Sequence, residues 1–336
     1  MLTNFIRARL AQRCAIVAAL LLALVRVAPA SAAEPTVLKV GISEAVNTVL
    51  AIWMAEAAGL YAANGLKPEI INMSGGSRGA AELAAGRIDA MHVGLSSVIR
   101  LNKTGGDLRV VASLANVIRF TFFSAPGVRT AADLKGGVVG ISSFGSETDT
   151  TVTLALQRLG LSRNDVALKE YGGGPRRIAA LKSGEIKATA VNEPVASMAR
   201  EQGVHVLVDL VPERIPWLFT AIVVKRGALA GQRDLLTRFI KATAEGNHIA
   251  LTDEKRAKEV LAEKTNTRDP KILDISYNDF RQLSPPNIEP TKAAAENILA
   301  QFPDASRSLD DYIDMSILDG LRQDGVFTAL QQKYRR

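Results

Sequence analysis

Short turns that combine glycine with hydroxyl or amide side chains recur in this chain, each directly after a β-branched or apolar run. In the first half they contain Ser43, Asn47, Ser74, Gly75, Gly76, Ser77, Gly94, Ser96 and Ser97. Further along the chain they contain Ser146, Thr148, Gly173, Gly174, Asn192 and Glu193. Glycine lets a backbone approach a ligand closely, helix starts carry free N–H groups, and hydroxyls both donate and accept. Gathered around one cleft, such turns could replace the hydration shell of a small polar molecule.

Each of these positions also has a simpler interpretation, because a single Ser or Thr often only caps its own helix. The placement of the whole set at equivalent strand ends favours a ligand site. Glu193 leaves two alternatives open. At a cleft mouth it would repel an anion and suit an amine or another N–H donor, or it turns away to pair with a base such as Arg119. Trp217 either closes over a ligand ring by stacking or fills a core beneath a hinge.

The sequence offers no assembled catalytic set. His92, His205 and His248 lie far apart, and no pair has the spacing of metal ligands. Phosphate-loop, nucleophile-elbow and dinucleotide fingerprints are absent. Glu147 and Asp149 stand where a helix is expected to begin and are interpreted as acids that complement its dipole. We therefore predict a protein that is not an enzyme, with no catalytic residue, no metal and no cofactor.

The order of elements repeats. Strand-like and helical patterns alternate, which indicates parallel strands with helical crossovers. Gly75-Gly76-Ser77-Arg78 is echoed about 100 residues later by Gly173-Gly174-Pro175-Arg176. After both motifs a leucine, a glycine and an isoleucine follow at matching spacings. A period this long indicates one α/β unit used twice, although two convergent strand-to-helix turns would be an alternative. Two such lobes would form a cleft between them. Ligand-binding sites occur preferentially at such domain interfaces.

The predicted organisation starts with an export signal over residues 1–33. Arginines precede an apolar run from Ala15 to Val25, and small residues suited to cleavage follow. Lobe one is expected over 34–118, lobe two over 119–219, and a return to lobe one with C-terminal helices over 220–336. Crossings near 119–124 and 216–225 would form a hinge. Removing the four arginines of the signal lowers the formal net charge from +7 to +3, which does not favour nucleic-acid binding.

Several motifs in this order resemble one family. Gly41-Ile42-Ser43, Ser74-Gly75-Gly76-Ser77 and Val93-Gly94-Leu95-Ser96-Ser97 are similar to those of the SsuA/THI5-like (NMT1-like) substrate-binding proteins, which serve ABC importers of the nitrate, sulfonate and taurine type. The resemblance implies a type II periplasmic binding fold, an α/β fold with two similar lobes around a ligand cleft and a helical C-terminal tail packed on lobe one. It also implies that the cleft is lined by Ser43, Asn47, Ser74, Ser77, Ser96, Ser97, Ser146, Thr148 and Asn192.

The resemblance further implies a monomeric periplasmic component that delivers a small molecule to a membrane permease and ATPase. The expected ligand is polar: a sulfonate, a carboxylate, an amine-bearing or a pyrimidine-like compound. An exported ligand-sensing subunit is one alternative. A THI5-like enzyme of pyrimidine-precursor synthesis, acting through His92, is another. The cysteine-rich motif of that enzyme is missing, and Cys14, the one cysteine, lies inside the predicted signal.

Overall fold

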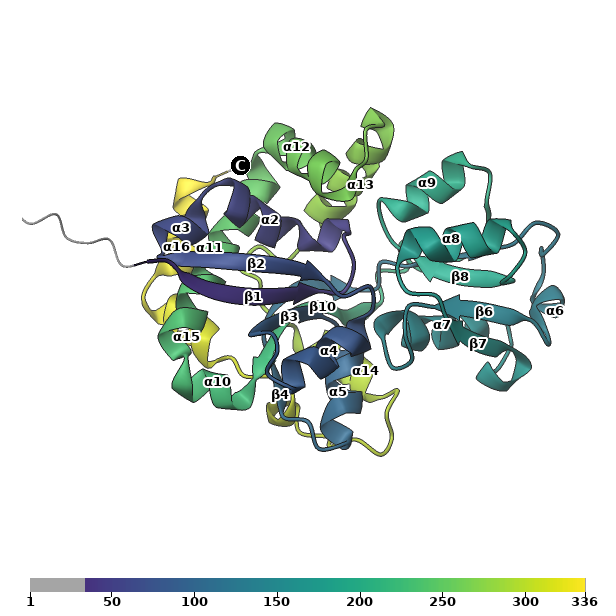
Figure 1. The fold of residues 1–336 in the computed structure, drawn as a ribbon, viewed down its shortest axis with the longest axis horizontal. Helices are drawn as coiled ribbons and strands as arrows, with labels where there is room; N and C mark the ends of the chain where they lie inside the picture. Colours follow the sequence, from purple (N-terminus) through teal and green to yellow (C-terminus); the bar gives the residue numbers. More distant parts are fainter. Residues whose placement is uncertain (1–33, 336) are drawn as a thin grey trace, which may run out of the picture. The chain divides into compact units, whose positions relative to one another are not determined.

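The computed structural model describes residues 34–335, so the predicted export signal over 1–33 lies outside the described residues. Two five-stranded sheets organise the described chain, one in each of two lobes (Figure 1). The first sheet has the order β2-β1-β3-β10-β4 and the second β7-β6-β8-β5-β9. In each, the first three strands pair in parallel and the fourth runs antiparallel to its neighbours.

The strands of the first sheet are β1 (Thr36–Ile42), β2 (Leu66–Asn72), β3 (Ala90–Val93), β4 (Leu108–Val117) and β10 (Pro216–Lys225). Those of the second are β5 (Thr121–Ser124), β6 (Val138–Ile141), β7 (Ala167–Glu170), β8 (Ala188–Val191) and β9 (His205–Asp209). The central strands β3 and β8 are buried at every position, as expected for strands covered on both faces.

Helices connect the strands of both lobes. Lobe one has η1 (Asn47–Val49), α2 (Leu50–Ala57), α3 (Leu60–Ala63), α4 (Gly76–Ala84) and α5 (Leu95–Lys103). Lobe two has α6 (Ala131–Leu134), α7 (Glu147–Arg158), η2 (Arg163–Asp165), α8 (Gly174–Lys182) and α9 (Val195–Glu201). The pairs α4/α8 and β3/β8 are offset by the same interval as the two glycine motifs. The two-lobed α/β fold and its internal repeat are therefore confirmed.

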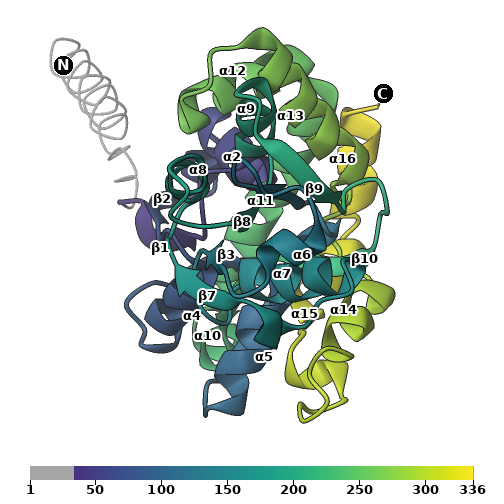
Figure 2. The ribbon, with the colours of Figure 1, turned by 90° about the vertical axis from the view of Figure 1, so that its right-hand side faces the viewer.

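The C-terminal part of the chain packs on lobe one, as predicted. It consists of α10 (Arg226–Gly231), α11 (Arg233–Thr252), α12 (Glu254–Thr265), α13 (Pro270–Leu283), α14 (Lys292–Leu299), η3 (Leu309–Asp311), α15 (Ser316–Gln323) and α16 (Val326–Lys333). Helix α11 packs along α2, and α14 packs on β10. Figures 1 and 2 show α13 reaching towards α9 of lobe two, where Lys271 pairs with Glu201 at 2.6 Å.

Two segments connect the lobes. Residues 118–120 join β4 to β5, and residues 210–215 join β9 to β10. Strand β10 already pairs with β4 at Pro216, so the boundary expected after residue 219 falls inside this strand. Its nearly continuous apolar sequence explains why the return to the first sheet begins earlier.

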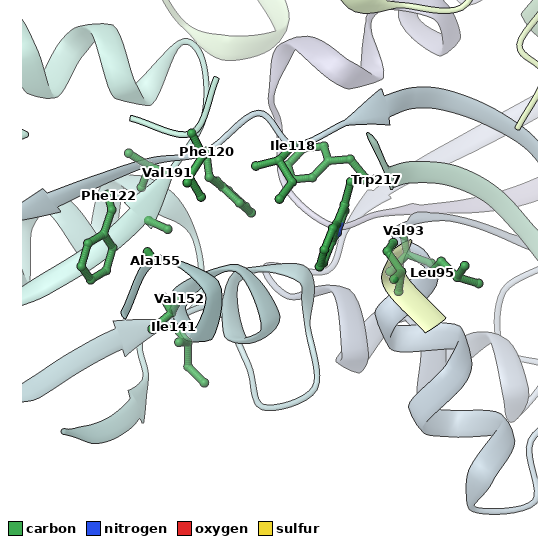
Figure 3. Close-up of a cluster of buried hydrophobic side chains, with 14 of the residues drawn as sticks. Val93, Leu95, Ile118, Phe120, Phe122, Ile141, Val152, Ala155, Val191 and Trp217 are labelled. Atoms are coloured by element: carbon green, nitrogen blue, oxygen red, sulfur yellow. The ribbon is translucent and has the colours of Figure 1, made fainter. Parts of the chain in front are cut away.

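Apolar side chains fill the crossing between the lobes. Ile118, Phe120 and Trp217 are buried in a hydrophobic cluster that also contains core residues of both lobes (Figure 3). The rings of Phe120 and Phe219 meet edge to face, with centroids 4.9 Å apart. Within residues 34–335 no helix combines the length and apolar character that crossing a membrane would need.

Candidate functional site

A small cavity lies between the lobes, with a volume of about 50 Å³. Both lobes contribute to its wall. Six of the predicted ligand residues line it: Ser43, Gly76, Gly94, Ser146, Thr148 and Asn192. The other side chains in the wall are Glu44, Val46, Thr48, His92, Val93, Phe120, Ser142, Glu147, Phe219 and Thr220. Among these lining residues of the described chain there is no lysine or arginine.

A second group of predicted residues lies where the two lobes touch. Ser77 and Ser143 share a hydrogen bond across the interface, with oxygens 2.6 Å apart. Gly75 lies so close to lobe two that a Cβ there would come within 2.9 Å of Ser143 Oγ. The Ser97 hydroxyl donates to the Gly145 carbonyl at 3.3 Å.

The two glycine motifs also lie close together. A Cβ on Gly172, the residue before Gly173, would lie 3.5 Å from the Ser74 carbonyl oxygen. The two glycine motifs thus face each other, as the repeat required.

Three further predicted residues, Asn47, Glu193 and Trp217, also lie outside the cavity wall, and their side chains bond elsewhere. Asn47 is fully buried, and its amide donates to Asp279 at 2.7 Å and to the Ser276 carbonyl at 3.0 Å, both on α13. Glu193 pairs with Arg200 at 3.1 Å and accepts from the Ser197 N–H. Burial raises the pKa of the Glu193 carboxyl. The structure therefore shows the second alternative for Glu193, in which the carboxylate pairs with a base and does not line the cavity.

The base that pairs with Glu193 is not the expected one, because Arg119 pairs with Asp279 at 3.2 Å instead. The third residue, Trp217, is only 1% exposed. Its indole N–H donates to Glu147 Oε2 at 2.8 Å. Gly173 stands outside the cavity wall as the N-cap of α8.

Glu147 joins the lobes from the first position of α7. Its Oε1 accepts the backbone N–H of Ser96, at the start of α5 in lobe one, at 2.8 Å. Its Oε2 accepts the Trp217 indole N–H. Gly94 permits this approach, because a Cβ there would lie 2.2 Å from the carboxylate. Burial raises the pKa of Glu147 to about 7, and the donors Trp217 and Ser96 act in the opposite direction.

Glu44 makes the reciprocal connection from lobe one. It accepts from Arg177 at 2.8 Å and from the backbone N–H of Gly174, at the start of α8, at 3.0 Å. The Arg177 side chain is fully buried and also donates to the carbonyls of Gly172 and Ala190. In both lobes, a carboxylate from the opposite lobe therefore lies against a helix start that the sequence had suggested for a ligand.

Two buried polar atoms of the cavity residues lack a hydrogen-bond partner within residues 34–335: His92 Nδ1 and Thr220 Oγ1. The other ring nitrogen of His92 lies 3.3 Å from Thr48 Oγ1. Burial lowers the pKa of His92 to about 4, which keeps the ring neutral at pH 7. Buried polar groups are normally satisfied, so these two atoms are suited to a bound partner.

The structure offers hydrogen-bonding groups rather than a metal centre. Among the residues that the structure describes, no three His, Cys, Asp or Glu side chains come together as a metal site would require. Sequence reasoning missed Glu44 and missed the role of Glu147. The only available signal was the pair of glycines, Gly94 and Gly174, that admits these carboxylates.

Trp217→Phe tests the link between β10 and α7. Phenylalanine keeps an aromatic ring in the core but removes the donor to Glu147. Because hydrogen bonds to charged groups contribute about 1.5–3 kcal/mol, we expect the free energy of unfolding in urea to fall by that amount beyond the loss of ring area. Trp53→Phe is the matched control, since Trp53 is also buried. Equal losses in the two variants would show that the Glu147 contact contributes nothing.

Comparisons with known proteins agree with this architecture. A family model described as NMT1/THI5 like matches residues 47–257. The riboflavin-binding protein RibY of Chloroflexus aurantiacus is 29% identical over 232 residues, which cover 65% of this chain and 64% of RibY. The match therefore spans slightly less than two thirds of that relative.

Two solved structures show the same fold. The alkanesulfonate-binding protein SsuA of Xanthomonas axonopodis pv. citri, bound to MOPS, has a TM-score of 0.66 at 20% identity, covering 80% of this chain and 92% of SsuA. The periplasmic nitrate-binding protein NrtA of Synechocystis PCC 6803 has a TM-score of 0.66 at 16% identity, covering 90% of each chain. These likenesses confirm the predicted periplasmic-binding fold. Since the family model matches well over half of its residues, the chain belongs to the NMT1/THI5-like family.

Proposed function

We propose that this protein is the extracytoplasmic solute-binding component of an ABC importer and that it captures a small polar organic molecule between its lobes. The observation that carries the proposal is the cavity lined by both halves of the internal repeat, whose largely apolar wall also holds hydroxyl, amide and carboxyl groups. The names of SsuA and NrtA, which have the same fold, support a binding role rather than catalysis. In this proposal the protein is periplasmic and monomeric, and its partners are a membrane permease and its ATPase.

Capture requires the lobes to move. Ligand pockets usually have volumes of about 300–1,000 Å³, whereas this cavity has about 50 Å³. A buried water needs roughly 10–15 Å³, so the closed cavity accommodates only a few water-sized groups. A ligand therefore enters when the lobes part at residues 118–120 and 210–215. Rotation about two crossing segments is the usual form of hinge closure.

The ligand classes that remain are those that can use hydroxyl, amide and carboxylate partners. Sulfonates, carboxylates, amines and pyrimidines are candidates from the family, and the name of RibY adds riboflavin. Asn192 lines the cavity from lobe two, and Thr220 lines it from β10. Both can donate and accept hydrogen bonds, so they suit a ligand with several polar atoms.

A thermal-shift screen of the purified protein tests this function with ethanesulfonate, nitrate, ethylammonium, cytosine and riboflavin. A compound present at a free concentration of 100 times its Kd should stabilise the folded state by about 2.7 kcal/mol and raise the melting temperature. Asn192→Ala should reduce that shift. Asn278→Ala, on α13 and outside the cavity wall, should preserve it. A screen in which no compound raises the melting temperature would argue against solute capture.

One observation favours a second candidate, an enzyme of pyrimidine-precursor synthesis. His92 is buried, neutral and in the cavity wall, with Nδ1 unpartnered in the described chain. If the protein is such an enzyme, His92→Gln should abolish turnover of a bound pyrimidine. A bound pyrimidine that is recovered unchanged from both the wild type and the variant would reject catalysis and leave capture.

A further inference from the structure

We propose that Glu147 determines which ligands this protein accepts: it fills the start of α5 with its own carboxylate, so the cavity rejects oxyanions and selects molecules that offer N–H donors or a positive charge. This inference rests on the proposed capture function and narrows its ligand class.

The Glu147 carboxylate occupies the start of α5. A helix start attracts anions because its free N–H groups and the helix dipole both favour negative charge. Helix α5, with nine residues, begins at Leu95, and its Ser96 N–H points at Glu147 Oε1 at 2.8 Å. The second carboxylate oxygen is held by Trp217. An oxyanion at this helix start would have to displace Glu147 or lie beside it, and both cost free energy.

A carboxylate also occupies the start of α8. The α8 N–H of Gly174 donates to Glu44, and the buried guanidinium of Arg177 pairs with the same carboxylate. The terminal nitrogens of Arg177 also donate to two backbone carbonyls, whereas its Nε has no partner in the described chain. Of the residues in the wall, only Glu44 and Glu147 have side chains that become negatively charged when they ionise, and burial keeps His92 neutral at pH 7.

The cavity wall also contains buried side chains with unpartnered polar atoms. His92 is 0% exposed and Thr220 is 7% exposed, and each has a side-chain atom without a partner in the described chain. Both line the same cavity as Glu147. A ligand that donates to Glu147 could also satisfy these two atoms. A neutral amino-heterocycle or a small ammonium compound has this chemistry, whereas nitrate and sulfonate groups only accept.

Calorimetric titration with three probes tests the proposal: ethanesulfonate as an anion, ethylammonium as a cation and cytosine as a neutral N–H donor. The wild type should bind cytosine or ethylammonium at least about tenfold more tightly than ethanesulfonate, because charge-assisted hydrogen bonds are the strong ones. Glu147→Ala and Glu147→Gln should weaken that binding about tenfold or more and should strengthen ethanesulfonate binding, since the α5 start is freed.

Glu170→Gln is the matched control, because Glu170 also connects the lobes, through Arg78 at 3.3 Å, but lies outside the cavity wall. It should leave the ranking of the probes unchanged. Circular dichroism and melting temperature identify a variant that has failed to fold. If Glu147→Ala does not fold, Glu147→Gln provides the test. If ethanesulfonate binds the wild type best and neither Glu147 variant changes this, the inference is overturned while solute capture stands. If none of the three probes binds the wild type or any variant, the inference is rejected, and the five-compound thermal-shift screen decides separately on solute capture.

Discussion

Arg177→Met is expected to lower the free energy of unfolding by about 3–5 kcal/mol, the usual cost of removing one partner of a buried ion pair. The guanidinium is fully buried and holds Glu44 of lobe one together with the Gly172 and Ala190 carbonyls of lobe two. Methionine fills the space but removes the guanidinium donor from all three acceptors, and Glu44 keeps only the Gly174 N–H. Chemical denaturation followed by circular dichroism measures the loss.

Arg176→Met provides the matched control on the same helix, since Arg176 is exposed and its substitution should change stability by no more than about 0.5 kcal/mol. Glu44→Gln, alone and combined with Arg177→Met, completes a double-mutant cycle. Because the two side chains are in contact, the cycle should give an interaction energy of about 0.5–3 kcal/mol. Additive losses, or equal effects at positions 176 and 177, would show that the Arg177–Glu44 pair does not connect the lobes.

Two cavity residues should give the protein opposite responses to pH. Burial raises the pKa of Glu147 to about 7 from an ordinary 4.5, so the folded state holds a proton that the unfolded state has lost. Its contribution to stability therefore falls as pH rises from 4.5 to 7. Burial lowers the pKa of His92 to about 4 from 6.5, so there the unfolded state holds the extra proton. The contribution of His92 therefore rises with pH from 4 to 6.5.

In the wild type these two contributions should nearly cancel between pH 4.5 and 6.5. In Glu147→Gln only the His92 contribution remains. The free energy of unfolding of this variant should therefore rise by roughly 3 kcal/mol relative to the wild type from pH 4.5 to 6.5. His92→Gln leaves Glu147 alone and should show a fall of similar size. Urea denaturation at half-unit pH steps measures all three proteins, and other carboxyl groups affect them equally. Parallel pH profiles in the three proteins would contradict the burial of both groups.

The fold was largely predictable because its signals are local. Glycines that end helices, such as Gly86 and Gly184, have positive φ angles that other residues rarely adopt. The β-branched runs before the turns formed strands at the expected places. Since the same sequence of signals occurs twice, the chain contains two equivalent lobes, and no long-range information was needed to recognise them.

The site was only partly predictable because its most specific contacts join residues far apart in sequence. Glu147 has the sequence signature of an acid that complements its own helix, but its carboxylate reaches Ser96 in the other lobe. Asp149, two residues later, does stay local and accepts from the Gly145 N–H. Nothing in the sequence near these two acids distinguishes them. Their difference follows from the face of α7 that meets lobe one.

Sequence alone determined that this chain builds two glycine-marked α/β units whose polar turns face a common cleft, because turn and strand preferences act over a few residues. Tertiary structure decided which groups line that cleft and which hold the lobes together. In the folded chain Asn47 donates to Asp279 of α13, Trp217 donates to Glu147, and Arg177 donates to Glu44. The reason is physical: a buried charge or N–H group takes whichever partner the packing of the two lobes brings within hydrogen-bonding distance.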